Sequence, residues 1–402
     1  MLSRKARRAA FTTAVLATAT AGLSAGPAHA ARGHVYVSTN AEAGNAVVVF
    51  NRDAKGRLYQ GGVFETGGNG AGGNPTFPVP ISDSDGMVTL SPNRKLLFAI
   101  NIGSNTITSF QVRGNGLRRI STVSTGGIGP NAADARNGVL YVTNTGGPGP
   151  GAPGSGGPPT GQPTMMGFRY SSGGTLTPIS GSQVNLPPVS LPAAIRLDPQ
   201  LTYLAVTERG ANQTQHFPLD AGHVPGTPVA YPVNTGSAHP FALALTSNDV
   251  MLTADEGNPP PDGPGGDSRI TSYNAATPQS PTPLDSDANS QTATCWIVLT
   301  GNERYGFASS ALSGMVTSFS LTAQGQITVI GAQPVTDTVA TDMGRSRDSK
   351  FLYVNSINVD PMALAFMSSR IDIYRINSDG TLALIGKTAS SLLGSGSGMA
   401  AY

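Results

Sequence analysis

Short apolar runs separated by turn residues occupy almost the whole chain. Four of these runs share one phrase, in which hydrophobic and aromatic residues lead to a terminal asparagine, at residues 35–40, 97–101, 140–144 and 351–355. Each is followed, after a loop, by a second apolar run that contains an aromatic residue. Runs of this length, rich in Val, Ile, Tyr and Phe and bounded by Gly, Asn and Pro, predict β-strands joined as hairpins.

The aromatic residue of the second run recurs at a regular spacing. It occupies seven positions at an average interval of about 54 residues: Phe50, Phe110, Phe168, Phe217, Tyr273, Phe319 and Tyr374. A repeat of roughly 50 residues made only of strands is typical of a β-propeller. The sequence therefore predicts an all-β fold, a propeller of seven four-stranded antiparallel blades.

Blades two to seven each open with a further short run of small and apolar residues, which predicts an innermost strand. These runs lie at residues 86–90, 132–135, 193–197, 241–245, 295–299 and 341–344. Blade one lacks such a run, and residues 398–402 resemble one with no blade after it. We therefore expect the chain's last strand to complete blade one and close the ring, which removes exposed sheet edges. A closed ring surrounds a central channel, and its mouth is where we look for function.

Three Gly- and Pro-rich tracts interrupt this pattern, at residues 66–83, 146–162 and 258–267, and predict solvated loops. The N-terminus has a different character. Basic residues at positions 4, 5, 7 and 8 precede an uncharged apolar stretch at 11–25 and a small-residue site at 28–30. This is the pattern of a secretory signal peptide, residues 1–30. We expect general secretory export, with the twin-arginine route as the alternative, and a single mature domain, residues 31–402.

The amino-acid composition argues against nucleic acids and membranes as binding partners. Charged residues make up only 12% of the chain and the net charge is +2, so the electrostatic signature of nucleic-acid binding is missing. Nothing after the N-terminal stretch is apolar enough to span a membrane. We expect a monomer that is secreted and extracellular, or periplasmic if the source has an outer membrane. The single cysteine, Cys295, lies in an apolar run and is interpreted as a buried residue.

Two phrases carry a resemblance to a known family. Residues 192–199, followed by residues 204–212, resemble lactonase-type seven-bladed propellers, and so do residues 239–243 with Asp255 and Glu256. That family includes bacterial 6-phosphogluconolactonase and the carboxymuconate-lactonising enzyme. The resemblance covers residues 34–402 and implies a site at the channel mouth. It places Glu208, Glu256 and His239 at positions where the family has acidic and histidine residues.

Three residues are the candidates for catalysis. His239 opens an inner strand and could activate a water molecule as a general base; the alternative is a structural histidine bonded to a neighbouring blade. Glu208 and Glu256 end equivalent strands of blades four and five, where two carboxylates could raise each other's pKa. The alternative is that each caps loop amides or pairs with Arg209 or Arg269.

Residues around the mouth are the candidates for substrate binding. They comprise one basic residue and the amides that end the second strands or the loops beside them: Arg209, Asn212, Asn144, Asn101, Asn40 and Asn355. A phosphorylated substrate would require several Arg or Lys residues, and few approach this mouth. Neutral amides bind ligands well but transfer protons poorly.

Three functions remain open at this point. The first is hydrolysis of a lactone or sugar-lactone ester at the channel mouth. The second is a non-catalytic propeller that binds a ligand, glycan or protein, and the third is a muconate-type lactonising cyclase. The expected partner is a small-molecule lactone, sugar or glycan. We expect no cofactor, and the sequence leaves open a divalent cation at the mouth.

Overall fold

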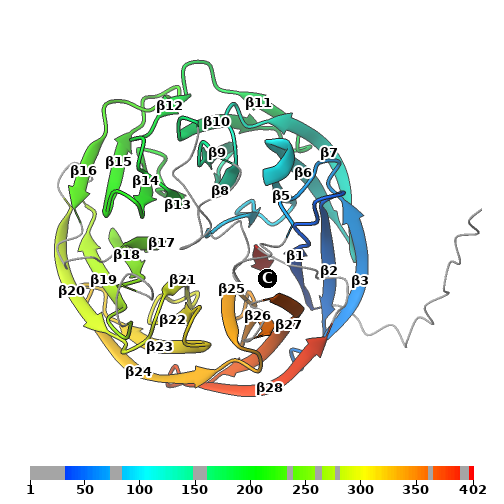
Figure 1. Ribbon diagram of the computed structural model, residues 1–402, viewed down its shortest axis with the longest axis vertical. Coiled ribbons are helices and arrows are strands. Elements are labelled where there is room, and N and C mark those ends of the chain that lie inside the picture. Colours follow the sequence, from blue (N-terminus) through cyan, green and yellow to red (C-terminus); the bar gives the residue numbers. More distant parts are fainter. Residues whose placement is uncertain are drawn as a thin grey trace, which may run out of the picture. The chain divides into compact units, whose positions relative to one another are not determined.

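A computed structural model places seven antiparallel sheets around a common centre (Figure 1). It describes residues 32–72, 84–147, 161–232, 239–258, 265–276, 281–360, 365–389 and 398–402. The predicted signal peptide lies outside these residues, as do most of the tracts at 146–162 and 258–267 and the second half of the tract at 66–83. The predicted seven-bladed propeller is confirmed.

Blades one to three follow one another along the chain. From the centre outward, their strands are β29 (Met399–Ala401), β1 (Gly33–Ser38), β2 (Ala46–Arg52) and β3 (Leu58–Glu65) in blade one; β4 (Val88–Leu90), β5 (Leu96–Asn101), β6 (Thr106–Arg113) and β7 (Gly116–Ser124) in blade two; and β8 (Pro130–Arg136), β9 (Val139–Asn144), β10 (Thr164–Tyr170) and the split outer pair β11 (Leu176–Pro178) and β12 (Val184–Asn185) in blade three. A single 3-10 turn, η1 (Ile102–Ser104), links β5 to β6.

Blades four to seven keep the same order. Their strands are β13 (Pro192–Leu197), β14 (Tyr203–Glu208), β15 (Gln213–Pro218) and β16 (Val229–Pro232) in blade four; β17 (Pro240–Leu245), β18 (Val250–Asp255), β19 (Arg269–Asn274) and β20 (Thr282–Ala288) in blade five; β21 (Thr294–Leu299), β22 (Tyr305–Ser310), β23 (Met315–Leu321) and β24 (Ile327–Pro334) in blade six; and β25 (Val339–Arg345), β26 (Phe351–Asp360), β27 (Ala365–Ile376) and β28 (Leu382–Ala389) in blade seven.

The end of the chain closes the ring, as the sequence predicts. β29 pairs antiparallel with β1, with Val35 opposite Ala401 and Val37 opposite Met399. Each blade's first strand contacts the first strands of both neighbouring blades, and β29 takes this place between β25 and β4. The seven inner strands therefore form a closed circle.

The aromatic residues that mark the repeat hold the blades together. All seven lie on third strands and are at most 5% exposed. Each hydrophobic cluster but the largest combines residues of two neighbouring blades, such as Val49 of blade one with Phe110 of blade two. Tyrosine hydroxyls add polar links, since Tyr353 of blade seven donates to the Gly56 carbonyl of blade one. Burial of these apolar faces accounts for most of the stability of such a fold.

The middle of the ring is occupied by residues 84–86, which lead into β4. The Ser84 hydroxyl donates to the Asn131 carbonyl of blade three (2.7 Å), and the Ser84 carbonyl accepts a hydrogen bond from Trp296 of blade six (3.1 Å). The Asp85 amide donates to the Ala193 carbonyl of blade four (2.8 Å). A segment that reaches three blades on different sides of the ring crosses its centre. We name residues 84–86 the plug.

Candidate functional site

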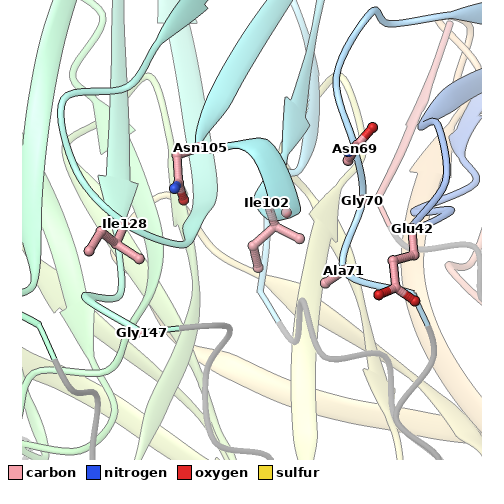
Figure 2. A pocket seen from close by; sticks show the side chains of 9 residues that line it. Glu42, Asn69, Gly70, Ala71, Ile102, Asn105, Ile128 and Gly147 are labelled. Carbon is pink, nitrogen blue, oxygen red and sulfur yellow. The ribbon is translucent and has the colours of Figure 1, made fainter.

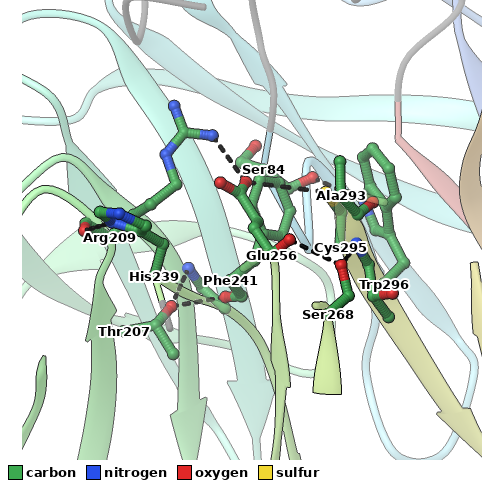
Figure 3. Close-up of polar contacts among 12 residues, drawn as sticks. Ser84, Thr207, Arg209, His239, Phe241, Glu256, Ser268, Ala293, Cys295 and Trp296 are labelled. Carbon is green, nitrogen blue, oxygen red and sulfur yellow. Dashed lines mark hydrogen bonds and ion pairs between the residues drawn. The ribbon is translucent and has the colours of Figure 1, made fainter. Parts of the chain in front are cut away.

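Residues that are far apart in sequence meet on one face of the ring over blades four and five. Arg209 directly follows β14, Glu256 directly follows β18, and His239 directly precedes β17. In an antiparallel blade the start of the first strand and the end of the second lie at the same edge. The three side chains therefore gather at one face (Figure 3). We call Arg209, His239 and Glu256 the mouth cluster.

A buried ion pair forms the base of the mouth cluster. Arg209 Nη1 lies 2.9 Å from Glu256 Oε1, and the two side chains are only 7% and 8% exposed. The Arg209 guanidinium also lies 5.7 Å from the ring centre of Phe241, within the range of a cation–π contact. The Cys295 thiol approaches the same Glu256 oxygen at 3.6 Å. Together these contacts join blades four, five and six.

His239 is held through three hydrogen bonds. Its amide donates to Asn212 Oδ1 (2.8 Å), and its carbonyl accepts from the Glu256 amide (3.2 Å). Its ring Nδ1 lies 3.0 Å from the Arg209 carbonyl oxygen. A carbonyl only accepts hydrogen bonds, so Nδ1 carries the proton and a neutral ring keeps its lone pair on Nε2. Within the part of the chain that the structure describes, Nε2 has no hydrogen-bond partner.

Glu208 is the third catalytic candidate, and it faces its own blade. It is fully buried, its Oε1 accepts from the Ser190 hydroxyl at 2.9 Å, and its Oε2 accepts from the Gln213 side chain. Burial raises the pKa of Glu208, while the hydrogen bonds from Gln213 and Ser190 lower it. The rise in the pKa of Glu208 thus comes from burial and not from a second carboxylate. The two glutamates have different partners: Glu208 accepts hydrogen bonds from Ser190 and Gln213, whereas Glu256 pairs with the Arg209 guanidinium.

The candidate asparagines make hydrogen bonds within their own blades, and Asn101 and Asn144 also bond to the preceding blade. Among the contacts of the described residues, only those of Asn212 reach the mouth cluster. The amide of each of the other four binds a residue of its own blade or of the loop that follows it: Asn40 binds Gly72, Asn101 binds Thr108, Asn144 binds Thr164 and Asn355 binds Thr341. These bonds tie the ends of the second strands, or in blade seven the middle of β26, to adjacent strands and loops. The recurrence of asparagine in the repeat therefore has a structural explanation.

A cluster of charged residues at the plug is not among the sequence-predicted site residues. Arg196 of blade four binds Asp85 of the plug at 2.5 Å. Asp342 of blade seven accepts hydrogen bonds from its neighbour Met343 and from Met399 of the closing strand, both at 2.7 Å. Burial, and next the charge of Asp85, raise the pKa of Asp342 well above its usual range. In the sequence, Asp85-Gly86 before a strand is typical of an ordinary turn. The ion pair between Asp85 and Arg196 becomes visible only in the folded ring.

Asp255, the neighbour of Glu256, carries part of the family resemblance but is not among the sequence-predicted site residues. It is 1% exposed, and its Oδ2 accepts a hydrogen bond from the Thr271 hydroxyl. Its Oδ1 has no partner within the described residues. Burial raises the pKa of Asp255 to about 6. It lies beside the mouth cluster but takes no part in it.

The described residues show neither a cluster of metal-ligating side chains nor a membrane-spanning helix. Across the described ranges, no group of three or more His, Cys, Asp or Glu residues is placed to hold a metal ion. None of the helices found there is long and apolar enough to cross a membrane.

The fold is shared with solved structures of low sequence identity. A proposed 6-phosphogluconolactonase from Bacteroides fragilis superposes with a TM-score of 0.66 at 16% identity, covering 94% of this chain and 100% of that one. A periplasmic gluconolactonase from Pseudomonas aeruginosa gives 0.65 at 15% identity, covering 91% and 98%. A hypothetical selenium-binding protein from Sulfolobus tokodaii gives 0.62 at 11% identity, covering 91% and 92%.

These comparisons define the class of fold. No protein-family model matches the chain, and a search of curated proteins finds no matching sequence. The chain has the fold of the lactonase-type seven-bladed propellers, as the sequence resemblance implies. Because propellers of this kind host different functions, the activity has to be argued from the site.

Proposed function

We propose that the protein is an exported lactonase-like hydrolase in which His239 acts as the general base. The observation that carries this proposal is the anchoring of Nδ1 by the Arg209 carbonyl at 3.0 Å, which leaves Nε2 as a proton acceptor on a half-buried ring. A base needs a lone pair, a fixed orientation and access to water. His239 combines these three properties within the mouth cluster.

The remaining members of the mouth cluster act as positioning residues. The Arg209 carbonyl fixes the His239 tautomer, and the Glu256 amide holds the His239 backbone. The Glu256 carboxylate is engaged by the Arg209 guanidinium, which makes it a poorer base than a free carboxylate. We therefore assign proton transfer to His239 and not to either glutamate.

The reaction balances with water as the only co-substrate. His239 Nε2 takes a proton from water while the water oxygen bonds to the lactone carbonyl carbon. The ring carbon–oxygen bond then breaks, and the leaving oxygen takes the proton back from His239. The product is an open-chain hydroxy acid. The N-terminal pattern and the periplasmic neighbour support export, and we expect the mature protein to be a monomer.

The test compares two variants, in each of which one histidine of similar backbone geometry is replaced with asparagine. His239 and His223 are both half-buried and have left-handed φ values of 47° and 61°. Asparagine tolerates this backbone region. His239→Asn keeps a donor for the Arg209 carbonyl but removes the base, whereas His223→Asn makes the same exchange outside the mouth cluster.

Turnover is measured by pH-stat titration of the acid released from a panel of aliphatic and sugar lactones. We expect His239→Asn to lower kcat/KM by about 100-fold or more, with His223→Asn close to wild type. Wild-type protein that hydrolyses no lactone, or a His239→Asn variant that keeps full activity, would refute the proposal.

A further inference from the structure

A separate cavity lies on the same face of the ring, over blades one to three. Its volume is about 430 Å³, which is within the range of small-molecule sites. Figure 2 shows the side chains that line it, contributed by the loops after β1, β3, β5, β7 and β9. No residue of the mouth cluster belongs to it. This cavity therefore does not depend on the proposed activity.

The walls of this cavity are fixed by tight backbone packing. The Gly103 amide donates to the Asn69 carbonyl (3.0 Å), which joins the loop after β3 to η1. A Cβ atom on Gly103 would come within 2.1 Å of the Gly70 carbonyl oxygen, so the two loops approach as closely as glycine allows. A binding site built this way is largely preformed, which limits the entropy lost when a ligand binds.

The polar groups of the cavity are one carboxylate and two amides. Glu42 is exposed and extends its carboxylate toward Ala71 (Figure 2). It makes no hydrogen bond or ion pair with any residue that the structure describes. Asn105 accepts from the Gly129 amide at 2.8 Å through its side-chain oxygen, so its NH₂ group is left for a ligand. Asn69 supplies the second amide.

The apolar part of the lining comes from Ile102 and Ile128. Ile102 is buried, whereas Ile128 is 51% exposed and so offers the cavity an accessible apolar surface. None of the described residues that line the cavity is a Lys, Arg or His. A carboxylate without a cation disfavours anionic ligands such as sugar acids and favours a ligand that brings its own positive charge.

We propose that this cavity binds a small, polyhydroxylated primary amine of the hexosamine class. The ammonium group pairs with the Glu42 carboxylate, and hydroxyl groups bond to the Asn69 and Asn105 amides. The carbon face of the ring packs against Ile102 and Ile128. The ligand is thus opposite in charge to the hydroxy acid that lactone hydrolysis releases.

Binding is measured by titration calorimetry and ligand-observed NMR, with the protein from residue 31 onward at mildly acidic pH, where the amine is protonated. The probes are glucosamine, glucose and gluconate, which carry a positive charge, none and a negative charge. We expect glucosamine to bind more tightly than glucose, and gluconate not to bind.

Two glutamate variants distinguish binding that depends on the cavity carboxylate from binding that depends on the general surface charge. Glu42→Gln removes the carboxylate in the cavity, and Glu65→Gln makes the same exchange at an exposed site of blade one outside the lining. We expect Glu42→Gln to weaken glucosamine binding about fivefold or more, with Glu65→Gln unchanged. Absence of glucosamine binding, equal affinities for glucose and glucosamine, or an equal effect of the two variants would overturn the proposal. Circular dichroism checks that both variants are folded.

Discussion

The buried carboxyl of Asp255 gives a quantitative prediction about stability and pH. Burial raises its pKa from 3.8 to about 6, outweighing the hydrogen bond from Thr271, the nearby Thr253 hydroxyl and the charge of Arg269, which lower it. The folded protein therefore holds a proton that the unfolded chain has already released. The stability linked to this proton is present below about pH 4 and is lost as the pH rises through about 6.

The size of the effect follows from the shift. A difference of about two pKa units corresponds to about 3 kcal/mol of unfolding free energy. Asp255 is 1% exposed, so water screens little of this cost. The propeller unit Ala31–Tyr402 has 372 residues, which gives an unfolding entropy of roughly 0.8 kcal/mol per kelvin. Ionisation of Asp255 in the folded protein should thus lower the Tm by about 4 °C.

The perturbation is Asp255→Asn. The new side chain keeps an oxygen for the Thr271 hydroxyl and places an NH₂ group at the position of Oδ1, which has no partner within the described residues. It also carries no charge at any pH. We expect the variant to gain about 3 kcal/mol over wild type between about pH 4 and pH 8.

The assay follows thermal unfolding by circular dichroism at a series of pH values, comparing variant and wild type at each one so that other titrating groups cancel. Asp249→Asn is the control, because Asp249 lies in an exposed turn of the same blade. A variant whose Tm difference from wild type is the same at pH 4 and pH 8 would contradict the argument. So would a matching gain in Asp249→Asn.

Two further predictions concern the joints of the ring. Glu256→Gln removes the carboxylate that pairs with the buried Arg209 guanidinium and should lower the unfolding free energy by about 3–5 kcal/mol. Chemical denaturation checks this, and replacing both residues with apolar ones should restore most of the loss. Deletion of residues 398–402 removes β29, which exposes the edge of β1 and removes the hydrogen bond from Met399 to Asp342. We expect the truncated protein to have a lower Tm and to aggregate on size-exclusion chromatography. A truncated protein that stays monomeric and keeps the wild-type Tm would contradict this.

The blades could be predicted from sequence because their pattern is local. Third-strand aromatic residues such as Phe110 recur at a regular interval, and the closing strand at residues 398–402 repeats the phrase of the other inner strands. The recurring aromatic residues and the closing strand can both be recognised from the periodicity of the sequence, together with the requirement that the last strand pairs with the first blade. Neither requires knowledge of which side chain touches which.

The partners of the polar residues could not be predicted in this way. The predicted equivalence of Glu208 and Glu256 is wrong: Glu208 is the last residue of β14, whereas Glu256 lies one residue beyond the end of β18, where Asp255 is the counterpart of Glu208. Glu208 bonds to Ser190 and Gln213, while Glu256 pairs with Arg209 of the neighbouring blade. The one-residue offset and the contact between blades both depend on the exact strand register, which the repeat does not encode. Glu42 likewise gives no sequence signal, because its cavity is assembled from five loops.

The plug changes where chemistry can take place in this ring. Residues 84–86 reach blades three, four and six, and Asp85 binds Arg196 at the centre. A ligand therefore has to be held on the face of the ring and not in an open channel at this level. The mouth cluster and the Glu42 cavity lie on one face because each blade ends its second strand there. The two sites differ in chemistry because their loops differ: one presents a histidine beside a neutralised ion pair, and the other a carboxylate with no cation among its lining residues. A single fold can in this way combine the proposed hydrolysis over blades four and five with the proposed amine binding over blades one to three.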